Sequence, residues 1–160
     1  MSALRSWQWR RRIRRMSLDV CNDFVLRDGV DGFVHIDHIL LRPEGLYVLD
    51  HLEGDGRLVA GERLPEWTLV GKRRRFVFPN PLRQLDHKLT AVRLLAGQGT
   101  VSGYVVMADR LVVPRAQPDR VVALAELANR LPHLPSDAAL TPEMAEAWGR
   151  IKDAASNATH

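Results

Sequence analysis

The sequence of 160 residues contains little cysteine and lysine, and it has no acidic residue before Asp19. Its one cysteine, Cys21, has no partner, which excludes an intramolecular disulfide. No basic segment leads into an apolar stretch long enough for a signal peptide or a membrane span, so we expect a soluble cytoplasmic protein. No internal repeat is present, and the content of 46% apolar and 26% charged residues indicates one globular domain with its own core.

The lack of acids near the N-terminus accounts for the formal net charge of +4. The remaining 145 residues hold 17 of the 23 basic residues and all 19 acids, because six arginines fall within the first fifteen positions: Arg5, Arg10, Arg11, Arg12, Arg14 and Arg15. Arg10, Arg11 and Arg12 are therefore candidates for binding nucleic-acid phosphates or for peripheral contact with an anionic membrane. If this segment is helical, Trp9, Ile13 and Met16 share one face; otherwise it is a solvated or frayed tail.

The order of the expected elements predicts an α/β fold. Helices are expected at 3–16, 82–95, 118–131 and 142–155, and strands at 17–28, 33–42, 46–52, 57–61, 101–108 and 111–113, with an outer hairpin over 65–78. This order predicts a mixed central sheet flanked by helices. The expected organisation is a basic helix or tail at 1–16, a core domain at 17–134 and a C-terminal helix at 135–160.

Two acids interrupt the apolar strands that flank the turn at Pro43-Glu44-Gly45. Side-chain alternation predicts that Asp37 shares a face with His35 and Ile39, and that Asp37 and Asp50 lie at the same end of the hairpin. Two carboxylates within reach of one another can hold a divalent metal over a phosphodiester. The alternative is that both are acids of a strand edge.

The segments around these acids carry a family resemblance. They are Ile36-Asp37-His38, Pro43 to Asp50, Gly56-Arg57-Leu58, Trp67, and Asn80-Pro81-Leu82-Arg83-Gln84 followed by His87. In this order and spacing they resemble the nuclease-related domain (NERD) family, a branch of the PD-(D/E)XK nuclease superfamily. The resemblance implies a restriction-endonuclease-like core.

The resemblance also implies roles for individual residues. Asp37 and Asp50 match the acids that bind the metal, and Gln84 matches the glutamine that points into the same site. The family places a catalytic lysine two residues after the second acid, where this sequence has Leu52. The glutamate that the family usually has on its first helix is also absent from residues 1–16.

A lysine elsewhere would have to replace the missing one in an active enzyme. Lys88 lies four residues after Gln84 on the same helical face and is the first candidate, although an ordinary solvated helix residue is the preferred interpretation. Lys72 or Arg73 is the second candidate. The basic run Lys72, Arg73, Arg74 and Arg75 either binds phosphates or forms a solvated tip.

Three histidines lie close to the two acids in the sequence. His35, His38 and His51 are either metal ligands or, as we prefer, hydrogen-bonded parts of the scaffold. Trp67 is expected to pack in the core.

Three functions remain open. The preferred one is a degenerate nuclease domain that retains the fold, with residual metal or nucleic-acid binding. The second is an active nuclease that uses Mg²⁺ or Mn²⁺ and Lys88, with DNA or RNA as its substrate. The third is a non-enzymatic interaction module, for which a homodimer is one arrangement.

Overall fold

The computed structural model describes residues 3–97 and 99–158. Side chains are described from Gln8 onward, so those of Arg5 and Trp7 lie outside the described residues. The elements are α1 (Ala3–Arg15), β1 (Asp19–Arg27), β2 (Phe33–Arg42), β3 (Gly45–Leu52), β4 (Gly56–Val59), β5 (Glu66–Val70), β6 (Arg75–Pro79), α2 (Pro81–Ala96), β7 (Val101–Met107), β8 (Leu111–Val112), β9 (Val121–Ala123), α3 (Leu124–Arg130) and α4 (Pro142–Asn157). None of the helices in this described part has the length and apolar composition that crossing a membrane requires.

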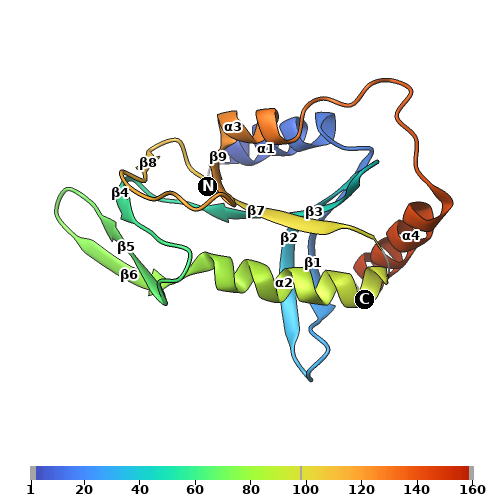
Figure 1. Ribbon diagram of the computed structural model, residues 1–160, viewed down its shortest axis with the longest axis horizontal. Coiled ribbons are helices and arrows are strands. Elements are labelled where there is room, and N and C mark those ends of the chain that lie inside the picture. The colour runs from blue at the N-terminus through green and yellow to red at the C-terminus, as the bar shows by residue number, and fades with distance from the viewer. Residues whose placement is uncertain (1–2, 98, 159–160) are drawn as a thin grey trace.

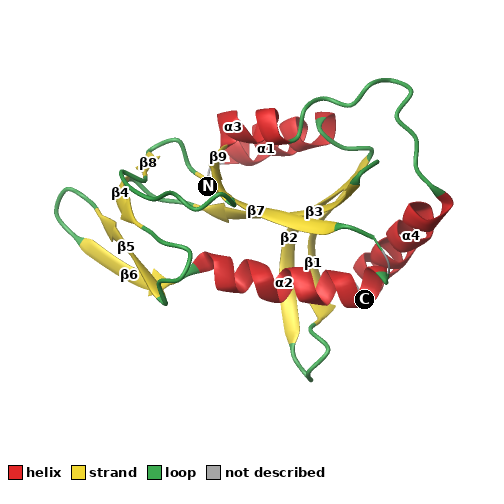
Figure 2. Ribbon diagram, viewed as in Figure 1, coloured by secondary structure: helices red, strands yellow, loops and turns green. Residues whose placement is uncertain are grey.

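A five-stranded mixed sheet forms the centre of the molecule. Its strand order is β1-β2-β3-β7-β9, in which β1, β2 and β3 are antiparallel and β3, β7 and β9 are parallel. Figures 1 and 2 show α1 and α3 on one face of this sheet and α2 on the other. The predicted α/β fold, with helices on both faces of a mixed sheet, is confirmed.

The second sheet is small and lies beside the first. Its order is β6-β5-β4-β8, and its outer hairpin is formed by β5 and β6, as predicted for residues 65–78. Trp67 is fully buried and its indole N–H donates to the Gly61 carbonyl at 2.9 Å, as expected for a packing residue. Asn80 is also fully buried, and its amide donates to the carbonyls of Glu62 and Leu64 while its oxygen caps α2 at Leu82. Asn80 therefore fixes the start of α2 relative to the small sheet.

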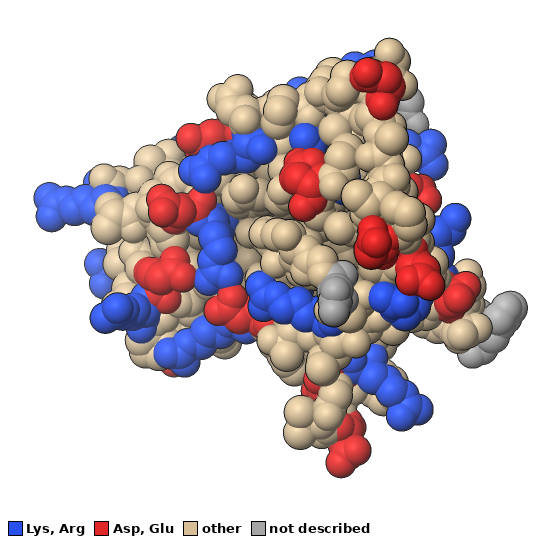
Figure 3. Space-filling view, turned by 45° about the vertical axis from the view of Figure 1, so that its right-hand side comes forward, with Lys and Arg blue, Asp and Glu red and all other residues tan. Residues whose placement is uncertain are grey.

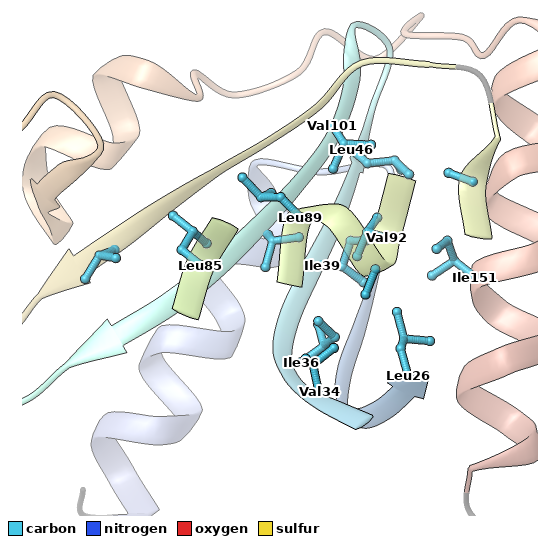
Figure 4. Close-up of a cluster of buried hydrophobic side chains, with 14 of the residues drawn as sticks. Leu26, Val34, Ile36, Ile39, Leu46, Leu85, Leu89, Val92, Val101 and Ile151 are labelled. Carbon is cyan, nitrogen blue, oxygen red and sulfur yellow. The ribbon is translucent and has the colours of Figure 1, made fainter. Parts of the chain in front are cut away.

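The larger core lies between the central sheet and helices α2 and α4. Figure 4 shows side chains from β1, β2, β3, β7, α2 and α4 meeting in this cluster. Gly103 allows the close approach of α2, because a Cβ at this position would lie 2.9 Å from Leu85 and 2.8 Å from the Val48 carbonyl. The apolar stripe predicted for this helix, with Leu85, Leu89 and Val92, is buried.

A smaller core lies on the α1 side of the sheet. Trp9, Ile13 and Met16 are buried there against Leu40, Val106 and other residues of the sheet and of α3. Of the two alternatives for the N-terminal segment, the helix with a shared apolar face is therefore the one observed. Because these three side chains pack inside the protein, they are not available to a membrane surface.

Arg42 connects several parts of the chain near the β2–β3 turn. Its side chain is almost fully buried, donates to the carbonyl of Met16 just after α1, and donates to the Pro132 carbonyl at 2.9 Å. It also pairs with Glu44 at 2.5 Å. One guanidinium thus joins the end of α1, the segment after α3 and the hairpin turn.

The helix predicted over 118–131 is wrong in its first half. Val121–Ala123 forms β9, which pairs in parallel with β7, and helix α3 begins only at Leu124. Val121 and Val122 are almost fully buried at this position. The β-branched valines complete the edge of the sheet, so tertiary packing decides the conformation of a segment whose sequence pattern also fits a helix.

Candidate functional site

A largely buried ion pair connects the central sheet to α2. Lys88 Nζ donates to Asp50 Oδ1 at 2.8 Å, and the two side chains are 15% and 9% exposed. Lys88 is therefore not the solvated helix residue that the sequence interpretation preferred. Burial raises the pKa of Asp50 above its ordinary value and the charge of Asp37 acts in the same direction, whereas Lys88 lowers it. Lys88 thus offsets the cost of placing a carboxylate in the interior.

Asp37 lies where β2 separates from β3. The two strands pair from Arg42↔Gly45 to His38↔Leu49, and continuing this register by one residue places Asp37 opposite Asp50. Beyond this point β2 continues with β1, and β3 continues with β7, so that the β1–β2 hairpin extends away from the sheet (Figure 1). The prediction that the two acids lie at the same end of the hairpin agrees with this geometry.

The side-chain alternation of β2 is interrupted at Asp37. Ile36 and Ile39 belong to the same core cluster, which a regular strand does not allow for residues three apart. On β1, the facing Asp23 has a positive φ of 59°. His35 bridges the irregular region, with Nε2 2.6 Å from Asp23 Oδ1 and Nδ1 3.3 Å from Asp37 Oδ1. The parity argument that places Asp37, His35 and Ile39 on one face is therefore wrong for Ile39, because the strand is not regular between them.

The two aspartates supply the donors that a divalent cation would need. Carboxylate oxygens suit Mg²⁺ and Mn²⁺, and Mg²⁺ is commonly held by one or two carboxylates together with water and substrate phosphate. Within residues 3–97 and 99–158, no group of three or more His, Cys, Asp or Glu side chains is arranged to hold a metal. The donor set therefore fits a cation that is shared with a substrate and does not fit a closed site made by protein ligands alone.

The other two positions implied by the family pattern differ in their surroundings. Leu52 lies two residues after Asp50 on the same face of β3 and packs against the larger core. The position where the family pattern has a lysine therefore carries no positive charge in this chain. Gln84 is exposed on α2, one helical turn before Lys88. Lys88 therefore contacts Asp50, whereas Gln84 faces solvent on the same helix.

His38 and His51 form a separate cluster on the opposite face of β3. Trp9 Nε1–H donates to His38 Nε2 at 2.7 Å, and His51 Nε2 lies 2.7 Å from the same atom. Because an indole nitrogen can only donate, His38 Nε2 is an acceptor and its Nδ1–H donates to Asn22 Oδ1 at 2.6 Å. Burial lowers the pKa of His38 to about 3 and also lowers the pKa of His51. His38 and His51 are thus neutral, hydrogen-bonded scaffold residues, as the sequence interpretation preferred.

The candidate nucleic-acid-binding residues lie in two places. Lys72, Arg73 and Arg74 form the turn between β5 and β6, and Arg75 begins β6. Arg10, Arg11 and Arg12 are exposed on α1. Figure 3 shows basic and acidic side chains mixed over one face of the molecule, without a large patch of either sign on that face.

Comparison with known families connects this geometry to a fold family. A family model described as the nuclease-related domain matches residues 6–108, which include most of α1 together with Asp37, Asp50 and Lys88. The chain belongs to the nuclease-related domain family. No curated protein and no solved structure matches the chain. The nuclease-related domain of this protein has an α/β core consistent with the PD-(D/E)XK superfamily.

Sequence reasoning found the charged residues of the site but missed part of its construction. The contact between Lys88 and Asp50 joins residues 38 positions apart, and the helical spacing from Gln84 was the only signal for it. The bond from Trp9 to His38 had no signal beyond the apolar stripe of α1. Asp23 was not singled out, although an aspartate tolerates positive φ better than most residues.

Proposed function

We propose that this nuclease-related domain is a metal-dependent phosphodiester hydrolase in which α2, instead of β3, supplies the lysine. The observation that carries the proposal is the 2.8 Å contact between Lys88 Nζ and Asp50 Oδ1 in a largely buried pair. Lys88, held at this carboxylate, replaces the lysine that the family pattern places at position 52, where this chain has leucine. The substrate class is nucleic acid, DNA or RNA.

The proposal assigns each residue a step. Asp37 and Asp50 hold a divalent cation, Mg²⁺ or Mn²⁺, which when bound polarises the phosphate and lowers the pKa of a coordinated water. Lys88 carries three N–H donors, and Asp50 accepts from one of them. The other two can orient the attacking water or a phosphate oxygen. Gln84, one turn earlier on the solvent side of α2, contacts the substrate.

The basic residues outside this site bind and position the nucleic-acid strand. Lys72, Arg73, Arg74 and Arg75 on the outer hairpin, with Arg10, Arg11 and Arg12 on α1, are exposed and able to contact phosphates. Such contacts position a strand without reading its sequence.

The test is a cleavage assay with Mg²⁺ and with Mn²⁺ on plasmid DNA, single-stranded DNA and RNA. Asp50→Asn and Lys88→Met are each expected to lower the rate about 100-fold or more, the usual effect of removing one electrostatic group from an active site. Lys152→Met is the matched control, because Lys152 lies on α4 and is more than half exposed. Circular dichroism of each variant separates loss of activity from loss of fold.

A second lysine substitution sharpens the test. In the Lys88→Met background, Leu52→Lys returns a cation to the position implied by the family pattern, and we expect part of the activity to return. Absence of cleavage by the wild-type chain with either metal would overturn the proposal, and so would equal activity in the Asp50→Asn variant.

A domain that binds nucleic acid without cleaving it is the second candidate. The observation that favours it is the replacement of the β3 lysine by Leu52, together with the absence of a three-ligand metal group within the described ranges. Saturable, salt-sensitive binding of nucleic acid, with no cleavage by the wild type and gain of cleavage in Leu52→Lys, would support this candidate over the first.

A further inference from the structure

A pocket of about 280 Å³ lies on the α1 face of the central sheet, away from the Asp50–Lys88 pair. It opens where the parallel strands β3 and β7 end, and α1 and the start of α3 close its sides. His51 lines this pocket, whereas the preceding residue, Asp50, contacts α2 on the opposite face. In open α/β sheets, the crevice outside the carboxyl ends of parallel strands is the usual place for a ligand.

The floor of the pocket is apolar. Trp9, Val106, Met107 and Leu124 supply this surface, and the first three are almost fully buried. The indole of Trp9 is held in place by its bond to His38 at 2.7 Å. Only a small part of the Trp9 ring faces the pocket, and together with the aliphatic side chains and a thioether it forms an apolar surface that suits a flat ligand ring.

The rim of the pocket is polar and carries charges of both signs. Gln8, Glu53 and Asp109 offer an amide and two carboxylates, which are the groups that pair with the edges of nucleobases. Arg12 and Arg110 offer two guanidinium groups, which suit a phosphate. Arg110 is 69% exposed and its ion pair with Asp55 is long at 3.8 Å, so this guanidinium can turn to a ligand.

The charge of the surrounding surface favours an anion. Arg10, Arg14 and Arg15 are exposed on the same helix as Arg12, and α1 has no acidic residue. Glu53, Asp109 and Asp55 offset the two rim arginines, and the other exposed arginines of α1 make the field beside the pocket positive. A neutral ring would make no use of the two rim guanidinium groups, and an inorganic anion would leave the apolar floor unfilled.

We propose that this pocket binds a nucleoside 5′-phosphate, either free or as the terminal nucleotide of a strand. The base lies on the apolar floor with its edge toward Gln8, Glu53 or Asp109, and the phosphate lies between Arg12 and Arg110. The proposal goes beyond the proposed hydrolase activity, because it needs neither a metal nor Asp50.

Calorimetric titration of the full chain tests this proposal. The ligands are the four nucleoside 5′-monophosphates, a 5′-phosphorylated dinucleotide, adenosine and inorganic phosphate. We expect saturable binding of one nucleotide per chain, with adenosine and phosphate each at least about tenfold weaker, since each lacks one half of the contacts. Tighter binding of the dinucleotide than of the mononucleotides indicates a strand terminus, and equal binding indicates a free nucleotide.

A pair of double variants provides the matched control. Arg12→Ala/Arg110→Ala removes the two charges at the rim and should weaken nucleotide binding at least about tenfold. Arg115→Ala/Arg130→Ala also removes two exposed arginines from the molecule, but neither lines the pocket nor lies on α1, so binding should stay within about twofold. All four arginines are exposed, so folding should be unaffected.

Three results would overturn the proposal. They are equal weakening by the two double variants, equally tight binding of inorganic phosphate, and no saturable binding at millimolar nucleotide. The Asp50→Asn variant separates the two proposals, because it should lose cleavage and keep nucleotide binding. Binding without any cleavage by the wild type would reject the hydrolase alone, and cleavage without nucleotide binding would reject the pocket alone.

Discussion

The two faces of β3 hold buried ionisable side chains in different charge states: a charged pair on the α2 face and neutral histidines on the α1 face. On the α2 face, Asp50 is buried next to a lysine at 2.8 Å. On the α1 face, the next residue, His51, is packed against Trp9 and His38 with ring centroids 4.4 Å and 4.9 Å away. Burial raises the pKa of Asp50 and lowers the pKa of His51, because in both cases desolvation disfavours the charged form.

The difference lies in the partner that each face provides. The α2 face brings a cation to the buried carboxylate, and so retains a charged pair next to Asp37. The α1 face provides neutral hydrogen-bond partners, which hold His38 and His51 in their neutral form. The α2 face therefore holds a charged pair in the interior, whereas the histidines buried on the α1 face hold a fixed aromatic ring.

The largest expected effect is on the α2 face. Asp50→Asn or Lys88→Met alone should lower the free energy of unfolding by about 3 kcal/mol, because each leaves one buried charge without its partner. The double variant Asp50→Leu/Lys88→Met should be close to the wild type in stability, since it removes both charges. Urea unfolding measures all three, and a double variant as unstable as the sum of the single variants would contradict this account.

On the α1 face, acid should weaken the structure. The unfolded chain binds a proton at His38 near pH 6.5, and the folded chain binds it only near pH 3. The stability that comes from burying neutral His38 is therefore fully present above pH 6.5 and is lost as the pH falls toward 3. Over this range the free energy of unfolding should fall by up to about 1.4 kcal/mol per pH unit. Urea unfolding across this range should show the slope in the wild type and in the control His133→Gln, which changes an exposed histidine, and a reduced slope in His38→Asn. An unchanged slope in His38→Asn would contradict the assignment.

A smaller effect is expected from the indole that holds the histidines. Trp9→Phe should cost about 1 kcal/mol, because the buried His38 Nε2 loses a donor while most of the ring volume remains. Trp148→Phe is the comparison on α4, where the acceptor Asp19 is 46% exposed and can bond to water instead. Thermal or urea unfolding should rank Trp9→Phe as the more destabilising change, and the reverse order would contradict the argument.

The smallest effect on stability is expected in the outer sheet. Replacing Lys72, Arg73 and Arg74 by alanine should change stability by less than about 0.5 kcal/mol, because all three are exposed in a turn. The same change should weaken nucleic-acid binding and reduce its salt dependence if the turn contacts phosphates. Arg115→Ala/Arg130→Ala, at two exposed positions elsewhere, is the control for a general loss of charge.

The sequence was sufficient for the features that depend on neighbouring residues. The hairpin around Pro43-Glu44-Gly45, the helix that begins after Asn80 and the cap of α4 at Thr141 all rest on local signals, and all are present. The apolar stripe of α1 was also readable, although whether it packed depended on a sheet formed later in the chain.

The sequence was insufficient where distant packing decides. Val121 and Val122 fit a helix by pattern and form a strand because β7 offers them an open edge. The irregularity at Asp37 depends on the positive φ of the facing Asp23, which alternation alone cannot predict. The pocket on the α1 face joins segments from Gln8 to Leu124, so it exists only after the sheet and both helices have assembled.

The burial of Trp9, Ile13 and Met16 affects how the protein can be shortened. The arginine-rich start of the chain looks removable in the sequence, yet its inner side covers Leu40, Leu49 and neighbouring apolar residues. Deleting residues 1–16 would expose an apolar patch on the sheet and leave the Arg42 guanidinium without its Met16 acceptor. An expression design that starts at residue 17 should therefore yield aggregated material, and the basic helix has to travel with the rest of the fold.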